Sequence, residues 1–292
     1  MAAPLEGKGA IVTGASRGIG AEIARELARQ GASILITYAR SSQQADDVVE
    51  ELKNINSSSK ARFKAIQADA AKATEAAEKI VAEATVLFDG HIDIIVNNAA
   101  NGEDLELSAV TQETFDASFH PNVLFPLLLV KFSKPVLAKK ARIVNLSSVG
   151  ARISYSSAIM YGASKAALES ITKSLAQELG LYNPSPPVSS GMGKCLYSSV
   201  QLSSFNANNI INTGHEYEAT VNAVNPGPVR TQMWSEVPNS DQLEEVLKGR
   251  TPAAPRLGEV NDIAPIVAFL CQEESRWVTA SVLNSNGGLL PV

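Results

Sequence analysis

Three side chains near the middle of the chain have the types and the spacing of a proton-transfer site. Tyr161 and Lys165 stand four residues apart, so they share one face of a predicted helix, and Ser148 ends a predicted strand. A free tyrosine has a pKa of about 10, and a lysine one helical turn away can stabilise its phenolate. Tyr161 could then protonate a carbonyl oxygen as a hydride reaches the carbon, while Ser148 hydrogen-bonds that oxygen. The competing interpretation is an ordinary exposed pair on an amphipathic helix.

A glycine-rich turn lies near the N-terminus, in the sequence VTGASRGIG at residues 12–20. Gly14, Gly18 and Gly20 fall there between a predicted strand and a predicted helix. Glycine permits a sharp turn, lets the backbone approach a pyrophosphate and leaves the first N–H groups of the helix free to bind it. A merely structural turn is the alternative, but the strand before it and the helix after it are the context of a dinucleotide site. We therefore predict that a dinucleotide cofactor binds at this turn.

The end of the second predicted strand indicates which dinucleotide binds. An enzyme that uses NAD usually carries Asp or Glu there to bind the ribose 2′-hydroxyl, whereas a 2′-phosphate favours cations and hydroxyls. The sequence TYARSS at residues 37–42 has no carboxylate, and it offers Arg40, Ser41 and Ser42 beside Arg17 of the glycine turn. Exposed arginines without a ligand are the alternative. The pattern favours NADP(H).

Short β-branched strands alternate with longer helical patterns along the chain. Continuous apolar strands separated by helices are typical of a parallel sheet that is covered on both faces. The predicted strands are 9–14, 33–38, 61–69, 92–98, 141–148, 220–227 and 280–284. The predicted helices are 19–30, 43–55, 74–88, 112–139, 161–180 and 261–271. This order predicts one α/β domain with a doubly wound parallel sheet.

The composition is that of an ordinary globular protein, with 45% hydrophobic and 19% charged residues. A net charge of -5 and the lack of a basic cluster argue against nucleic acid and anionic membranes as partners. We see neither a secretory signal nor an apolar run long enough to span a bilayer. The two cysteines give neither a disulfide framework nor metal-ligand spacing, so we expect a cytoplasmic protein without a metal.

Seven motifs together resemble the short-chain dehydrogenase/reductase family over nearly the whole chain, residues 181–214 excepted. They are TGASRGIG from Thr13, NNAA from Asn97, FDASFHPN ending at Asn122, SS from Ser147, YGASK from Tyr161, NPGPVRT from Asn225 and RLGEVNDIAPIVAFL from Arg256. The resemblance implies a single Rossmann-type domain over residues 1–292, with a seven-stranded parallel sheet flanked by helices. It also implies a homotetramer or a homodimer.

The resemblance also assigns roles to individual residues. It implies that Ser148, Tyr161 and Lys165 are catalytic and that Lys165 also holds the nicotinamide ribose. Asn122 would complete the catalytic set by anchoring a water that relays protons to Lys165. The full set of expected cofactor-binding residues includes the glycine turn and the two arginines. Its members are Gly14, Ser16, Arg17, Gly18, Ile19, Gly20, Tyr38, Arg40, Ser41, Asp69, Asn97, Ala99, Tyr161, Lys165, Pro226, Gly227, Val229 and Thr231.

Three departures from the family pattern are visible. Ala100 stands where the family usually has glycine, which is a mild steric change. Pro121 directly precedes Asn122, and because proline lacks an N–H we expect the helix to be kinked there. Ala280 and Ser281 replace the usual Gly and Gln, which would loosen subunit contacts. None of the three removes a catalytic group.

The segment 231–256 stands where this family builds its substrate lid. With Met233 and Trp234 in it, and Tyr155 and Met160 opposite, we expect an apolar wall that suits a bulky cyclic or polyketide-like compound better than a free sugar. The expected activity is NADP(H)-dependent interconversion of a ketone and a secondary alcohol. The runner-up is a 3-oxoacyl-carrier-protein reductase, and the alternative outside enzymes is an NADP-binding sensor or scaffold.

Residues 181–214 differ from the rest of the chain. Ser and Asn dominate this 34-residue stretch, and no helical or strand period persists in it. Helix-to-strand links inside compact domains usually have about 2–6 residues. Joining Gly180 to His215 would restore such a link, so our hypothesis is an intron translated in frame, and the alternative is a surface insertion. A surface insertion would emerge on the side of the sheet opposite the cofactor, so we expect this segment to contribute less to function than any other part of the chain.

Overall fold

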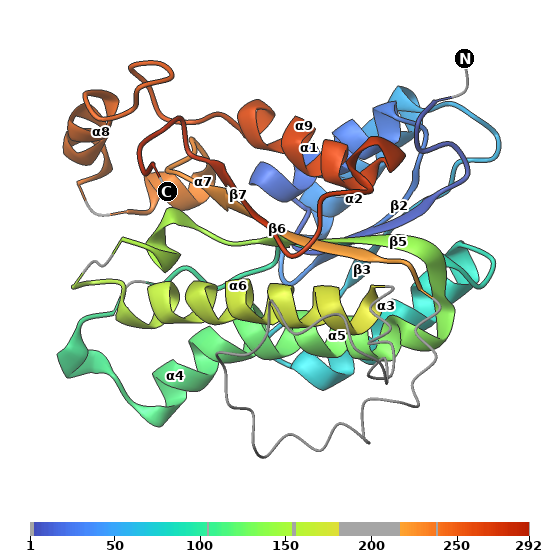
Figure 1. Cartoon of the computed structure of the whole chain (residues 1–292), viewed down its shortest axis with the longest axis horizontal. Coiled ribbons are helices and arrows are strands. Elements are labelled where there is room, and N and C mark those ends of the chain that lie inside the picture. The colour runs from blue at the N-terminus through green and yellow to red at the C-terminus, as the bar shows by residue number, and fades with distance from the viewer. Residues whose placement is uncertain (1–2, 104, 154–155, 181–216, 238, 292) are drawn as a thin grey trace, which may run out of the picture.

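The computed structural model describes residues 3–103, 105–153, 156–180, 217–237 and 239–291. Its core is one seven-stranded sheet, parallel throughout, with the strand order β3-β2-β1-β4-β5-β6-β7 (Figure 1). The strands are β1 (Gly9–Val12), β2 (Ser33–Tyr38), β3 (Phe63–Gln67), β4 (Ile92–Asn97), β5 (Leu137–Leu146), β6 (Thr220–Pro226) and β7 (Val282–Ser285). The predicted doubly wound sheet is thereby confirmed.

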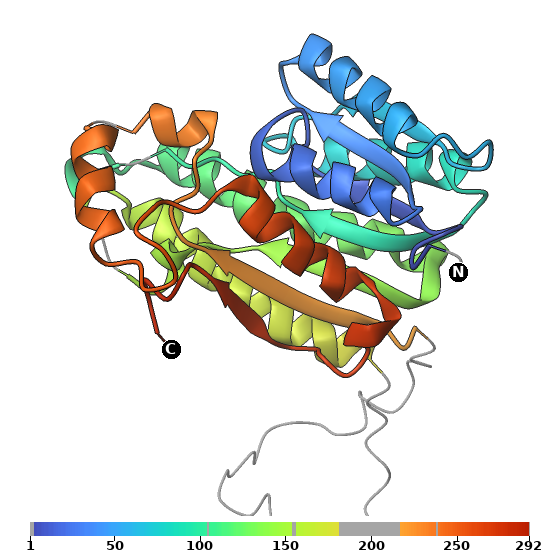
Figure 2. The same ribbon diagram turned by 90° about the horizontal axis from the view of Figure 1, so that it is seen from above.

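Helices cover both faces of this sheet. One face carries α1 (Gly18–Arg29), α2 (Ser42–Ile55) and α9 (Val260–Cys271). The other carries α3 (Ala73–Leu87), α4 (Gln112–Phe119), α5 (Phe125–Ser133) and α6 (Ile159–Leu179). Two short helices, α7 (Gln232–Ser235) and α8 (Ser240–Lys248), lie together at one end of the sheet (Figure 2). None of the described helices is long and apolar enough to cross a membrane.

The strands are apolar on both sides because helices cover both faces of the sheet, and successive side chains of a strand point to opposite faces. In β1, Ile11 packs into the cluster under α3 and α5, whereas Val12 packs into the cluster under α1 and α9. Both side chains are fully buried. Fully burying a side chain of this size stabilises a fold by about 1.5–3 kcal/mol, so the central strands fix the two layers of helices.

The single helix predicted for residues 112–139 is wrong. Helix α4 runs into a π-helical turn, η2 (His120–Leu124), and α5 then ends at Ser133. A short 3-10 turn, η3 (Lys134–Val136), contains Pro135, and β5 begins at Leu137. Pro135 supplies no N–H to the carbonyl four residues before it, so the α-helical hydrogen-bond pattern cannot continue through this position. The irregularity expected at Pro121 takes the form of the π turn.

The hypothesis about residues 181–214 concerns a segment outside the described residues, but the chain on either side of it is described. Helix α6 ends at Leu179, whose carbonyl accepts a hydrogen bond of 3.1 Å from Ala219 N–H. Tyr217 Oη donates to the carbonyl of Lys134 at 3.0 Å. These contacts lie at the edge of the sheet where β6 begins, and Ser148 lies two residues after the end of β5, at the opposite edge.

Candidate active site

The predicted functional residues gather at the carboxyl edge of the sheet. The glycine turn follows β1, Asn97 ends β4, Ser148 follows β5 and Pro226 ends β6. The strand order reverses direction between β1 and β4, which leaves a crevice where open α/β sheets bind ligands. The topology therefore brings segments from four parts of the sequence to one place.

Lys165 is a buried cation beside the ring of Tyr161. It is 3% exposed, and its Nζ donates to the carbonyl of Leu146, the last residue of β5, at 2.7 Å. The same Nζ lies 5.7 Å from the centre of the Tyr161 ring. Burial lowers the pKa of Lys165 from 10.5 to about 8. The ammonium group is thus held close enough to a tyrosine to favour its phenolate form.

Ser148 starts the 3-10 turn η4 (Val149–Ala151), and its Oγ accepts a hydrogen bond of 3.1 Å from Gly150 N–H. A β-carbon added at Gly150 would lie 3.4 Å from Ser148 Oγ and 3.4 Å from Tyr161 Cε1, so the serine and the tyrosine flank this glycine. A β-carbon at Gly162 would lie 2.7 Å from the Gly150 carbonyl oxygen. Glycine at position 162 is therefore needed for α6 to pack closely against η4.

Asn122 lies in the π turn and is 1% exposed. Its Oδ1 accepts from Asn101 N–H at 2.7 Å, and its Nδ2 donates to the Asn101 carbonyl at 2.8 Å and to Ser164 Oγ at 3.0 Å. Ser164 Oγ in turn donates to the carbonyl of Tyr161 at 2.7 Å. The Asn122 side chain thus joins the segment after β4 to the first turns of α6, and its expected role in proton relay stays a prediction.

The glycine turn offers free backbone donors at the start of α1. Gly14 and Gly18 have φ angles of 63° and 61°, a region that favours glycine. The N-cap residue of α1, Arg17, makes no side-chain capping hydrogen bond, and the first turn of the helix has no acidic residue. The N-terminal N–H groups and the positive end of the helix dipole are therefore available to a phosphate.

Asn98, which the sequence reasoning did not select, fixes the shape of this turn. Its Nδ2 donates to the carbonyls of Thr13 and Gly14 at 2.9 and 3.0 Å. A β-carbon at Gly20 would lie 2.4 Å from the same Nδ2, so a larger residue at position 20 would displace Asn98. Asn97, which was selected, donates from Nδ2 to Asn145 Oδ1 at 2.8 Å inside the sheet.

The residues expected around the adenosine lie at the ends of β1, β2 and β3. Arg17 and Arg40 are exposed, and within the described part of the chain neither is paired with a carboxylate. Asp69 is exposed and accepts a hydrogen bond of 3.0 Å from Ala71 N–H. Tyr38 ends β2, and Ser41 is the N-cap of α2. The two guanidinium groups are thus available to a phosphate at this end of the crevice.

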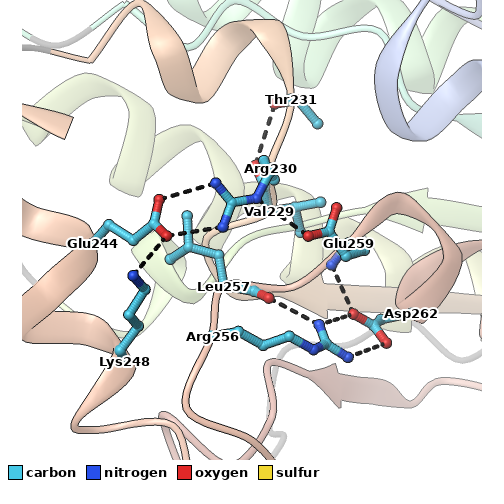
Figure 3. A network of polar contacts seen from close by, with 9 residues as sticks. All are labelled: Val229, Arg230, Thr231, Glu244, Lys248, Arg256, Leu257, Glu259 and Asp262. Atoms are coloured by element: carbon cyan, nitrogen blue, oxygen red, sulfur yellow. Dashed lines mark hydrogen bonds and ion pairs between the residues drawn. The ribbon is translucent and has the colours of Figure 1, made fainter. Parts of the chain in front are cut away.

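The loop after β6 contacts both the glycine turn and the segment predicted to be the lid. A β-carbon at Gly18 would lie 3.6 Å from Thr231 Cγ2, and Thr231 caps α7. Arg230, between Val229 and Thr231, donates to both carboxylate oxygens of Glu244 on α8 at 2.8 and 3.3 Å and to Glu259 at 3.2 Å (Figure 3). This ion-pair network joins α8 to the loop that contains the predicted nicotinamide contacts.

Met233 of the predicted lid approaches the tyrosine. A β-carbon added at Gly102 would lie 3.1 Å from Met233 Sδ and 3.9 Å from Tyr161 Cε2. Met233 itself is 51% exposed. Of the predicted apolar wall, Trp234 and Met160 are half-buried, and Tyr155 lies outside the described residues. The backbone at Gly102, in the segment after β4, and the Met233 side chain of α7 therefore lie close to Tyr161.

Comparisons with known proteins agree with this geometry. Residues 8–184 match the family model described as short chain dehydrogenase, and residues 212–290 match the model described as Enoyl-(Acyl carrier protein) reductase. The chain is 41% identical to the short-chain dehydrogenase/reductase FrzI of Cladobotryum sp, with 98% of this chain and 96% of that protein covered. It is 35% identical to L-xylo-3-hexulose reductase of Hypocrea jecorina (99% and 98% covered) and 34% identical to the hydroxynaphthalene reductase-like protein Arp2 of Metarhizium anisopliae (97% and 95% covered).

Among solved structures, the chain is similar to a short chain dehydrogenase from Burkholderia cenocepacia in complex with NADP. The TM-score is 0.78 at 30% sequence identity, with 98% of this chain and 99% of that chain covered. The match of one family model to more than half of the chain agrees with the parallel sheet and with the residues assembled at its carboxyl edge. The chain therefore belongs to the short-chain dehydrogenase/reductase family, as an oxidoreductase that acts on carbonyl and alcohol groups.

Proposed function

We propose that this protein interconverts a ketone and a secondary alcohol with NADP(H), and that Tyr161 is its general acid and base. The observation that carries the proposal is the grouping of three side chains: Ser148 Oγ and the Tyr161 ring flank Gly150, and Lys165 Nζ lies 5.7 Å from the ring centre. A hydroxyl, a phenol and a buried cation at one strand end are the groups that a carbonyl oxygen needs when it gains negative charge.

Each of the three residues has a separate task in the proposed reduction. Ser148 donates a hydrogen bond that orients the carbonyl oxygen, and Tyr161 transfers its phenolic proton to that oxygen. Lys165 stabilises the phenolate that remains. The nicotinamide, when bound, supplies the hydride to the carbonyl carbon and is itself oxidised, so the ketone gains one hydride and one proton and becomes the alcohol. In the reverse direction, the Tyr161 phenolate accepts the proton of the alcohol.

Residues of the crevice fit a phosphorylated dinucleotide. The uncapped start of α1 and the positive φ angles of Gly14 and Gly18 support pyrophosphate binding at the glycine turn. The exposed Arg17, in the glycine turn, and the exposed Arg40, just after β2, support a 2′-phosphate and hence NADP(H) rather than NAD(H). The similar Burkholderia dehydrogenase was solved in complex with NADP, which also supports this choice.

For the substrate we propose a bulky cyclic or polyketide-like ketone. Met233 near Tyr161 and the half-buried Trp234 and Met160 support an apolar pocket wall. A hydroxynaphthalene reductase-like protein among the relatives supports a fused-ring compound. A hexulose reductase among them favours a keto sugar instead, and an acyl thioester is the runner-up that shares every motif of the site.

One set of assays separates these functions. The purified full chain is assayed with NADPH and with NADH against α-tetralone as a fused-ring ketone, acetoacetyl-CoA as an acyl thioester and fructose as a keto sugar. We expect the highest kcat/KM for α-tetralone with NADPH. Exclusive turnover of acetoacetyl-CoA or of fructose would overturn the proposed substrate class, and a preference for NADH would overturn the proposed cofactor.

A single variant tests the mechanism. Tyr161→Phe removes the phenolic hydroxyl and leaves the ring, so we expect loss of turnover together with unchanged NADPH binding in a fluorescence titration. Turnover retained by Tyr161→Phe would show that the tyrosine is not the acid. NADPH binding by a wild-type chain that reduces none of the three carbonyl compounds would favour the sensor or scaffold.

A further inference from the structure

Glu169 is a buried carboxylate that the proposed proton transfer does not use. It lies on α6, four residues after Lys165, and is 7% exposed. Taking a charged group out of water costs several kcal/mol unless hydrogen bonds and an opposite charge offset the loss. The partners of Glu169 therefore indicate what the fold gains by keeping it there.

One oxygen of Glu169 joins the ends of two neighbouring strands. Its Oε1 accepts hydrogen bonds from Ser147 Oγ at 2.8 Å and from Asn225 Nδ2 at 3.1 Å. Ser147 directly precedes Ser148, and Asn225 directly precedes Pro226, the first of the predicted nicotinamide contacts. The carboxylate thus anchors the chain just before the proposed catalytic serine.

The other oxygen anchors the chain just after that serine. Its Oε2 accepts from Arg152 Nε at 3.1 Å and lies 3.0 Å from Arg152 Nη2, so two guanidinium nitrogens meet this one oxygen in a charge-assisted pair. Arg152 ends the turn η4, which contains the Gly150 N–H that donates to Ser148 Oγ. Both sides of Ser148 are therefore tied to one carboxylate on the helix that also carries Tyr161 and Lys165.

We propose that Glu169 is a positioning residue, which holds Ser148 at the distance from Tyr161 that lets both groups reach one carbonyl oxygen. This inference rests on the proposed function. Displacement of a reacting group by about 1 Å can lower a rate by about 100-fold, so a remote anchor of this kind has a measurable effect on kcat. A purely structural ion pair would instead change stability and leave kcat as it is.

Glu169→Gln tests the proposal, because it keeps the shape of the side chain, removes its charge and turns one acceptor into a donor that faces other donors. With NADPH and the ketone that the wild type reduces best, we expect kcat to fall by about 100-fold. The dissociation constant of NADPH should change by less than kcat does, because the hydrogen bonds of Glu169 reach the chain beside the predicted nicotinamide contacts but none of the residues expected to bind the pyrophosphate or the adenosine. Glu169→Asp keeps a carboxylate, and it should recover about tenfold in kcat over the glutamine variant.

The matched control is Glu273→Gln, which breaks the 3.0 Å ion pair with the buried Arg142 inside β5. Both substitutions take the charged partner from an arginine, but only Arg152 lies in the turn that Ser148 starts. We expect kcat of the control to stay within about twofold of the wild type. An equal loss of kcat in both variants, or a folded Glu169→Gln protein with kcat within about threefold of the wild type, would overturn the proposal.

Two further variants apply where Glu169→Gln does not fold. Ser147→Ala and Arg152→Gln each remove one anchor and leave the carboxylate, and each should lower kcat by about tenfold in a folded protein. Unchanged kcat in both would refute the positioning role.

A wild type without any ketone turnover would refute the proposed function instead. In that case a crystal structure of Glu169→Gln decides on the anchor, since Ser148 Oγ in its original place beside Tyr161 would refute the positioning role as well.

Discussion

Lys165 Nζ lies 5.7 Å from the centre of the Tyr161 ring and donates a hydrogen bond to the carbonyl of Leu146. The buried ammonium group is therefore held at the end of β5, beside the tyrosine. Burial lowers the pKa of Lys165 to about 8, which brings its titration close to neutral pH. A lysine carries its charge below its pKa and loses it above. The stabilisation of the Tyr161 phenolate should therefore depend on pH in the range where the enzyme is assayed.

We expect ketone reduction to slow above about pH 8, because neutral Lys165 no longer stabilises the phenolate that forms when Tyr161 gives up its proton. The measurement is kcat/KM for the ketone at saturating NADPH between pH 6 and 10, since this ratio includes the proton transfer to the ketone. Lys165→Arg stays charged throughout, so its profile should lose the alkaline fall at a lower plateau. A flat wild-type profile up to pH 9.5 would contradict the role of Lys165.

Replacing Lys165 by methionine should stabilise the fold and abolish activity. The pKa shift from 10.5 to about 8 means that the charged form costs about 3 kcal/mol in the folded state. Between about pH 8 and 10.5 the unfolded chain holds a proton that the folded chain lacks, so wild-type stability should rise with pH there.

Methionine removes this cost at pH 7, and losing the hydrogen bond to the Leu146 carbonyl offsets about 1 kcal/mol of the gain. We expect thermal denaturation to show a higher midpoint for Lys165→Met, by about 2–4 °C for each kcal/mol gained. Lys173→Met, at an exposed site on the same helix, is the control and should leave the midpoint unchanged. A lower midpoint for Lys165→Met would show that the buried cation is well compensated.

Arg40 should discriminate between the two nicotinamide dinucleotides. Arg40→Ala removes an exposed guanidinium at the end of β2, so KM for NADPH should rise by about tenfold or more, since a hydrogen bond to a charged group contributes about 1.5–3 kcal/mol. KM for NADH should stay the same. Arg250→Ala, at an exposed arginine after α8, is the control. An equal effect of Arg40→Ala on both cofactors would argue against a 2′-phosphate at this position.

The alternation of apolar strands and helical patterns was sufficient to predict the sheet, because each central strand is apolar on both faces. The helix predicted over 112–139 was too long, because the start of β5 has the sequence LAKK at residues 137–140, and Leu, Ala and Lys all have high helix propensity. Propensity therefore favoured a helix where pairing with β4 makes a strand.

The catalytic candidates could be selected from their spacing, whereas the residues that hold them could not. Glu169 stands four residues after Lys165 on the same face of α6, and this spacing was the available signal. A glutamate on a helix is usually exposed, so only the burial and the hydrogen bonds of Glu169 distinguish it. Asn98 was missed for a similar reason, because its neighbour Asn97 has the same residue type and opposite orientation.

Ala280 has a φ angle of 55°, in the left-handed region that disfavours residues with a β-carbon. Ala280→Gly should therefore stabilise the protein by about 1 kcal/mol, after the greater freedom of glycine in the unfolded chain is taken into account. Thermal or urea denaturation measures the change. Ala254→Gly, at a half-buried loop alanine without a positive φ, should instead be neutral or destabilising. Stabilisation of both variants, or of neither, would count against backbone strain at Ala280.

Deleting residues 181–214 should leave a folded and active enzyme. The variant joins Gly180 to His215, so that Gly180 and residues 215–219 form a six-residue link between α6 and β6, within the usual length of about 2–6 residues. The hydrogen bond from Ala219 N–H to the Leu179 carbonyl already closes the described ends of that link. These ends lie at the edge of the sheet away from Ser148, so we expect kcat and the dissociation constant of NADPH to stay within about twofold of the full chain.

Two measurements test the deletion and its origin independently. Loss of the folded state, or a fall in kcat of more than about tenfold, would show that residues 181–214 contribute to the working protein. Sequencing the transcript tests the hypothesis of a translated intron, for which the dominant message should lack the codons of this segment. A dominant message that retains them would leave a genuine insertion at the edge opposite the site. In that case the deletion variant still reports whether the insertion affects catalysis, because nothing in its expected kcat depends on how the segment arose.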